Sequence, residues 1–200
     1  KLIPMFTLSQ VQSQRRAALS VALLNLGLAG SFITIVVRSP WKLAFALVSI
    51  MALAIYGCEL IAILRARKRR TLDWGIRYFL TAVVLLVPVS ILSAVLSWTG
   101  LPLTPFTGQF ENLYGFLGLI GVVSFAIIGM LYKVIPFLVW FGVYGPHIGR
   151  TRVPSLADLY STRLQVAGYW SFLAALAITS AAILLENHPG VRIGCGLLTV

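Results

Sequence analysis

Two charged side chains inside apolar stretches are the residues of this sequence whose positions most suggest chemistry. Lys133 lies within the run GLIGVVSFAIIGMLYKVIPFLVW at residues 118–140, three residues before Pro136. Glu59 lies within another run, at residues 42–64. A charge at the centre of a membrane helix costs about 2.5–3.5 kcal/mol on insertion scales, so an ionisable group at that depth is a functional candidate. Either residue could line a proton path, and Lys133 could also bind an anion.

Each charge also has a structural explanation, and we favour it in both cases. Lys133 could extend its aliphatic stem along apolar surface and place its ammonium among the lipid headgroups. Glu59 could pair with Arg77, which opens the next apolar run at a similar depth. Asn25 is expected to form a hydrogen bond between helices, and Pro88 to kink its helix at a point where neighbours satisfy the freed backbone group.

Four glycines lie on or near the run that contains Lys133. Gly115, Gly118 and Gly121 recur every three residues, and Gly129 follows them. Small residues at such spacing allow the backbone of a neighbouring helix to approach closely. The alternative is that they leave room for a flat cofactor, and we favour close helix packing.

The remaining reactive side chains do not form a recognisable site. His147 and His188 both lie in expected loops, His188 within the turn sequence ENHPG. Cys58 and Cys195 lie in separate apolar runs and form no C-x-x-C motif. We expect no catalytic residue and no metal-ligand set, because paired carboxylates, nucleophile triads and phosphate-binding loops are all missing from the sequence.

Composition places the chain in a membrane. Hydrophobic residues make up 59% of the 200 residues and charged residues 10%, and the mean hydropathy is +0.94. A soluble core does not need so large an apolar fraction, so the sequence predicts an all-α polytopic transmembrane bundle whose first partner is the lipid bilayer. The net charge of +11 falls in short loops between apolar runs, which argues against nucleic-acid binding.

The sequence predicts five complete spans, with partial segments at both ends. Each span has about the 20 apolar residues that cross a hydrocarbon core. Their expected bounds are residues 17–37, 42–64, 76–98, 111–140 and 164–185, and a sixth span would begin at residue 192.

Lysine and arginine predict how the spans are oriented. Thirteen of the sixteen fall on one side of the expected membrane, whereas Arg38, Lys42 and Arg192 fall on the other. The richer side is predicted to be cytoplasmic, with the N-terminal side of the chain facing the cytoplasm.

A short repeat suggests a larger period. KLIPMF begins at Lys1 and KVIPFL begins at Lys133, 132 residues later, and a basic polar loop follows each copy. We therefore expect a single transmembrane domain built from four-helix units, in which residues 1–8 end one span, residues 17–140 form a complete unit and residues 164–200 open another. The chain also starts at Lys1 inside an apolar segment, so we expect it to be part of a longer membrane chain.

The segments YGFLGLIGVVSFAIIGMLYKVIPFLVW and KLIPMFTLS resemble the helix ends of bacterial membrane proteins related to haem-copper oxidase subunit I, including the NnrS type. In that family twelve helices form three four-helix arcs. The resemblance implies the bacterial cytoplasmic membrane, a respiratory redox complex and other membrane subunits as partners. On this resemblance, a haem is either bound elsewhere in the full chain or complex, where Lys133 could contact a propionate, or has been lost.

One departure from that family decides the functional hypothesis. Oxidase subunit I carries metal-ligating histidines on the second helix of an arc, but residues 42–64 contain no histidine. The first hypothesis is therefore an accessory or scaffold subunit that lacks metal ligands in this segment. A transporter or channel with a polar path near Lys133 and Glu59 is the second, and a purely structural membrane subunit is the third.

Overall fold

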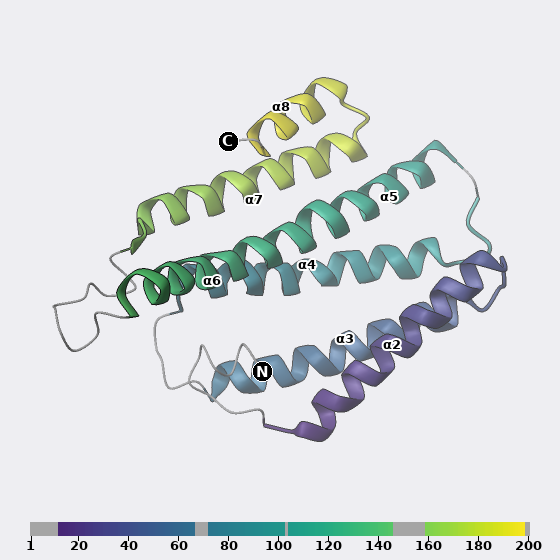
Figure 1. Ribbon diagram of the computed structural model, residues 1–200. Helices are drawn as coiled ribbons and strands as arrows, with labels where there is room; N and C mark the ends of the chain where they lie inside the picture. Colours follow the sequence, from purple (N-terminus) through teal and green to yellow (C-terminus); the bar gives the residue numbers. More distant parts are fainter. Residues whose placement is uncertain (1–11, 67–71, 103, 146–158, 199–200) are drawn as a thin grey trace. The chain divides into compact units, whose positions relative to one another are not determined.

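The computed structural model describes residues 12–66, 72–102, 104–145 and 159–198, which are built of helices and contain no strand (Figure 1). In chain order the helices are α2 (Gln14–Val36), α3 (Lys42–Arg65), α4 (Trp74–Leu96), α5 (Pro105–Phe116), the π-helix η1 (Leu117–Val123), α6 (Ser124–Tyr144), α7 (Thr162–Leu184) and α8 (His188–Leu198). Five helical stretches of the described chain are long and apolar enough to cross a membrane, because α5, η1 and α6 run on as one. The predicted all-α transmembrane architecture is confirmed.

The fourth span is longer than its sequence predicted, because it starts at Pro105 rather than at residue 111. Thr104 caps this start: its main-chain oxygen accepts from the Gly108 amide (3.3 Å) and its hydroxyl from the Thr107 amide (3.3 Å). Proline suits the first position of a helix, where its missing N–H is not needed. The segment rich in proline, threonine and glycine before residue 111, where no helix was predicted, thus contains the start of α5.

A π-helical stretch interrupts the same span. Residues Leu117–Val123 form η1, and regular α-helix resumes at Ser124. π-Helical turns are rare and often lie at functional sites. This one includes Gly118 and Gly121, two of the three glycines that recur every three residues.

The described helices group into two compact units. One contains α2, α3 and residues 86–114, and the other contains residues 73–85 and 115–198. The division crosses α4 between Leu85 and Leu86, shortly before Pro88, and it crosses α5 between Tyr114 and Gly115, shortly before η1 begins.

In the first unit, α2 and α3 form a closely packed hairpin. A Cβ atom on Gly27 would lie 2.9 Å from the backbone nitrogen of Ser49, and one on Gly30 would overlap the ring of Phe45. The buried residues of α2 are all small, namely Ser20, Gly27, Gly30 and Thr34. Small residues at the contact let helix backbones approach inside a membrane, where no hydrophobic effect drives them together.

In the second unit, aromatic rings from α4, α6 and α7 form the core. Phe125 is 0% exposed and Tyr78 is 1% exposed, and their ring centroids lie 5.6 Å apart. Phe172 meets Phe125 edge-on with centroids at 4.8 Å. Helix α8 returns along α7, where Gly194 lies against Thr179.

The first helices of the hairpins α2–α3 and α7–α8 have the same length, and they begin and end in the same way. Each first helix has 23 residues and follows an extended serine, and Ser161 lies 148 residues after Ser13. Each ends on a residue with positive φ, 54° at Arg38 and 51° at Glu186, which also lie 148 residues apart. The amide of the next residue then bonds a carbonyl five residues back, Ser39 to Thr34 and Asn187 to Ala182, each at 2.9 Å. This pattern is the Schellman motif, in which glycine usually takes the positive-φ position.

Glycine at either of these turns is expected to stabilise the protein. Arg38→Gly and Glu186→Gly remove the contact between Cβ and the carbonyl that disfavours left-handed backbone, so each is expected to gain up to about 1 kcal/mol. The measurement is unfolding in mixed micelles followed by circular dichroism. Val37→Gly is the control: Val37 precedes the turn at φ −81°, so glycine there is expected to lower stability. A loss of stability in both turn variants would contradict the strain argument.

Candidate functional site

Lys133 forms an ion pair with Asp73, which sequence reasoning had not connected to it. The ammonium of Lys133 in α6 donates to Oδ2 of Asp73. The side chains are only 16% and 27% exposed, respectively. The ammonium of Lys133 therefore has a carboxylate partner within the protein, in contrast to the favoured explanation in which it reaches toward lipid headgroups alone.

Asp73 is held by the start of α4. Its main-chain oxygen accepts from the amides of Ile76 (3.0 Å) and Arg77 (3.2 Å), and its Oδ1 accepts from the Trp74 amide (3.1 Å). The Trp74 amide and the positive end of the α4 dipole therefore both interact favourably with the Asp73 side chain. Asp73 lies just outside the predicted span 76–98. Only its depth, which is close to that of Lys133, could have indicated that the two residues pair.

A close contact between backbones brings the two charges together. A Cβ atom on Gly129 would lie 2.7 Å from the carbonyl oxygen of Gly75 and 2.9 Å from the amide nitrogen of Phe79. One on Gly75 would lie 2.8 Å from the carbonyl oxygen of Gly129. Gly75 is two residues after Asp73, and Gly129 is four residues before Lys133. The glycines therefore let α4 and α6 meet where the ion pair forms.

Three tyrosines lie beside this contact. The ring of Tyr78 meets those of Tyr132 and Tyr169 edge-on, with centroids at 5.3 and 5.1 Å. The Tyr78 hydroxyl donates to the main-chain oxygen of Gln165 (3.2 Å). The hydroxyl oxygens of Tyr169 and Thr81 lie 2.8 Å apart. Because the Thr81 hydroxyl donates its proton to the Arg77 carbonyl (3.0 Å), Tyr169 is the donor between the two hydroxyls. Sequence reasoning singled out none of these hydroxyls, since tyrosine is ordinary near a membrane interface.

Arg77 lies over an aromatic ring. Its guanidinium carbon is 4.4 Å from the centroid of Trp74, a cation–π distance. The Trp74 ring in turn contacts Tyr169, with centroids at 5.5 Å. Trp74 thus covers one face of the Arg77 guanidinium, for which Glu59 was the predicted partner.

Glu59 instead anchors the start of α2. The residue is 4% exposed, its Oε1 accepts from the Ser13 amide (2.8 Å), and its Oε2 lies 3.5 Å from Nε of Arg16. The Ser13 hydroxyl accepts from the Arg16 amide (3.3 Å), which completes the cap of the helix. The dipole of α2 and the Ser13 amide both interact favourably with the buried Glu59 side chain at the start of this helix. Glu59 therefore joins α3 to α2.

Asn25 forms a different hydrogen bond from the one that was expected. Asn25 donates to the carbonyl of Val21 in its own helix (2.9 Å), where a bond between helices was expected. An exposed amide one turn after a carbonyl can satisfy itself locally.

Only some of the four glycines on this span pack closely against a neighbouring helix. Gly129 meets backbone, and a Cβ atom on Gly121 would lie 3.4 Å from a Leu85 methyl group. No described atom lies within 4 Å of the corresponding positions on Gly115 and Gly118. Periodicity gave the spacing of these residues, but not which of them face a neighbour.

The described residues do not fit a haem or copper site. An axial ligand needs an imidazole held within the bundle. Among described residues the histidine is His188, which is exposed at the first position of α8, and no three His, Cys, Asp or Glu side chains of that part of the chain converge. His147 lies outside the described residues, as does the segment KLIPMF. Both cysteines are free and exposed.

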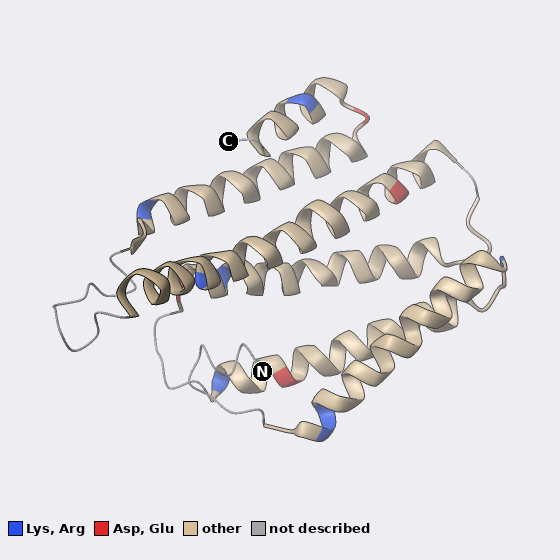
Figure 2. Cartoon of the chain, viewed as in Figure 1, with Lys and Arg blue, Asp and Glu red and all other residues tan. Residues whose placement is uncertain are grey.

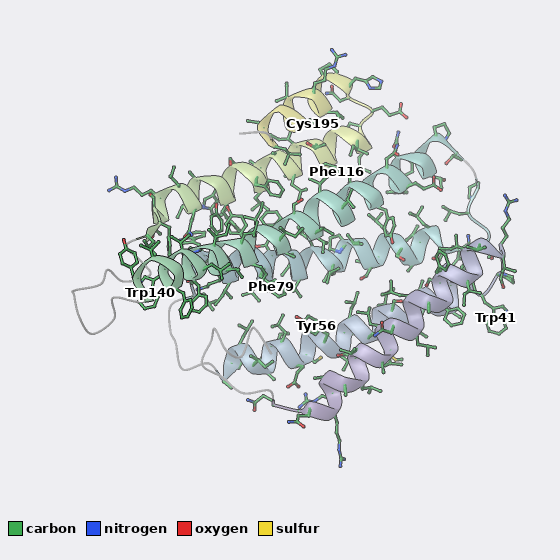
Figure 3. The ribbon with its side chains drawn as sticks, viewed as in Figure 1. Trp41, Tyr56, Phe79, Phe116, Trp140 and Cys195 are labelled. Carbon is green, nitrogen blue, oxygen red and sulfur yellow. The ribbon has the colours of Figure 1, made fainter. Side chains whose placement is uncertain are left out.

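Long apolar helices with charges near their ends define the class of protein. The central parts of the helices are almost free of charged side chains (Figure 2). Trp41 lies at the α2–α3 connection and Trp140 toward the C-terminal end of α6 (Figure 3), the kind of position that interfacial tryptophans take. The chain is an integral, all-α membrane protein.

Comparison with known proteins takes this assignment no further: no family model, no curated protein and no solved structure matches the chain.

Proposed function

We propose that the chain is an accessory, helix-packing part of a bacterial membrane redox complex, related in architecture to haem-copper oxidase subunit I. It would lie in the cytoplasmic membrane with the N-terminal side of α2 facing the cytoplasm. The observation that carries the scaffold role is that the two candidate charges, Lys133 and Glu59, are both used in contacts between helices. Lys133 joins α6 to α4 through Asp73, and Glu59 joins α3 to α2 through Ser13 and Arg16.

The recurrence of the hairpin supports a repeated architecture. The start of α2 and the start of α7 lie 148 residues apart, and so do their Schellman turns. The segments KLIPMF and KVIPFL lie 132 residues apart in the sequence. An insertion of 16 residues between Lys133 and Ser161 would bring the two offsets into agreement. The α7–α8 hairpin would then open a second four-helix unit, as α2–α3 opens the first.

Charge-removing variants of the full chain in its native membrane test the scaffold role. Lys133→Met and Glu59→Gln are compared with Arg192→Met, which removes an exposed cation of α8. Native gel electrophoresis of the solubilised complex measures assembly, and uptake of labelled solutes into vesicles measures transport. We expect the first two variants to lower the amount of assembled complex and leave uptake unchanged, whereas Arg192→Met assembles normally.

The opposite outcome would favour a transporter. Intact assembly together with altered uptake in Lys133→Met or Glu59→Gln would overturn the scaffold proposal. The redox part has its own readout: the purified complex is expected to show a reduced-minus-oxidised haem band contributed by residues or subunits outside the described segment. A colourless complex would remove the redox assignment and leave the helix-packing role standing.

A further inference from the structure

A buried amide oxygen at the start of α7 lacks a donor. Gln165 is 4% exposed, and its Oε1 is buried without a hydrogen-bond partner among the described residues. Nearly all buried polar atoms in proteins bond to a protein group or to an ordered water. An unsatisfied one within an apolar bundle is costly, so this oxygen calls for a donor.

Two phenol hydroxyls lie against the face of α7 that carries Gln165. Tyr78 donates to the main-chain oxygen of Gln165 itself. A Cβ atom on Gly168 would lie 3.2 Å from the Tyr78 hydroxyl oxygen and 3.8 Å from that of Tyr132. Gln165 and Gly168 are three residues apart and therefore neighbours on one helix face. Because Gly168 has no side chain, both hydroxyls can approach the helix beside Gln165.

We propose that Gln165, Tyr78 and Tyr132 bind a buried water molecule. A buried water needs two to four polar partners. This water would donate one proton to Gln165 Oε1 and the other to a lone pair of the Tyr78 oxygen, whose own proton is given to the Gln165 carbonyl. It would accept a hydrogen bond from the Tyr132 hydroxyl. Water suits the site better than a bound cation. Lys133, the residue after Tyr132, already carries a positive charge, and its ammonium already pairs with the Asp73 carboxylate.

Radiolytic hydroxyl footprinting tests this water site directly. X-ray pulses split bound water into radicals that oxidise the nearest aromatic ring, even where bulk solvent cannot reach it. The protein is reconstituted in phospholipid nanodiscs, and oxidation is located by mass spectrometry. Phe125 is the internal control, because its ring is as buried as that of Tyr78 and contacts it. We expect oxidation of Tyr78 severalfold above that of Phe125, and equal low oxidation of both rings would overturn the proposal.

A variant that removes the acceptor gives a second readout. Gln165→Met keeps the length of the side chain, and Gln14→Met on the exposed start of α2 is the matched control. If water binds at Gln165, we expect the Gln165 variant to lose the excess oxidation of Tyr78 and to unfold more easily than the control. If Gln165→Met retains that oxidation, or is more stable than wild type, Gln165 does not hold a water. Should this variant fail to fold, the comparison of Tyr78 with Phe125 in the wild-type protein still decides.

Discussion

Replacing Gly129 with alanine is expected to destabilise the protein by about 2–3 kcal/mol, the upper range for overpacking a well-packed core. The new methyl group would lie 2.7 Å from the Gly75 carbonyl oxygen and 2.9 Å from the Phe79 amide nitrogen. Both atoms belong to the backbone of α4, so no side-chain rotation can relieve the clash. The helices would have to separate, which also weakens the Lys133–Asp73 pair and the contact of Tyr78 with Tyr132. Unfolding in mixed micelles by circular dichroism measures the loss.

Gly142→Ala is the matched control for this substitution. Gly142 lies in α6 as Gly129 does, but no described atom comes within 4 Å of a Cβ atom placed there. Its replacement is expected to change stability by less than about 0.5 kcal/mol, as substitutions away from packed features do. Equal effects at the two positions would mean that loss of glycine in α6 matters in itself and that the contact with Gly75 does not.

The number and the approximate bounds of the spans could be predicted from sequence because both depend on hydropathy. The predicted second span, residues 42–64, differs from α3 (Lys42–Arg65) by one residue. Within the fourth span, however, the π-helix η1 was not predicted. Hydropathy is the same whether a carbonyl bonds the amide four or five residues later, so it does not distinguish a π-helix from an α-helix.

The partners of the two charges were harder to predict. Hydropathy gives the depth of a residue but not the direction in which it faces, so the sequence placed Lys133 near Asp73 in depth without linking them. For Glu59 the information was present in the topology. A short connection makes α2 and α3 antiparallel neighbours. Residues equally far from that connection then face each other, as Arg16 and Glu59 do. The predicted partner of Glu59, Arg77, lies on the following helix, whereas its observed partners lie at the start of the preceding one.

Removing Asp73 is expected to cost more than removing Lys133, although the two form one ion pair. Asp73→Asn keeps an acceptor for the Trp74 amide but leaves the Lys133 ammonium partly buried without its countercharge. Breaking a fully buried pair in this way costs 3–5 kcal/mol, and the partial exposure of both side chains lowers the expected loss to about 2 kcal/mol. Lys133→Met removes the cation altogether. Its expected cost is about 1 kcal/mol, because Asp73 keeps the Trp74 amide and the dipole of α4.

The double variant Asp73→Asn with Lys133→Met measures how strongly the two residues are coupled. If they interact directly, the double variant is expected to lose about 1–2 kcal/mol less than the sum of the single losses. Asp73→Asn combined with Arg192→Met provides the comparison, and its effects are expected to add. Unfolding in mixed micelles gives the free energies of the six proteins in the two cycles. Additive effects in the Asp73–Lys133 cycle would show that Lys133 is stabilised by lipid headgroups independently of Asp73. A coupling confined to this cycle would establish that the charge within α6 is there to hold α4.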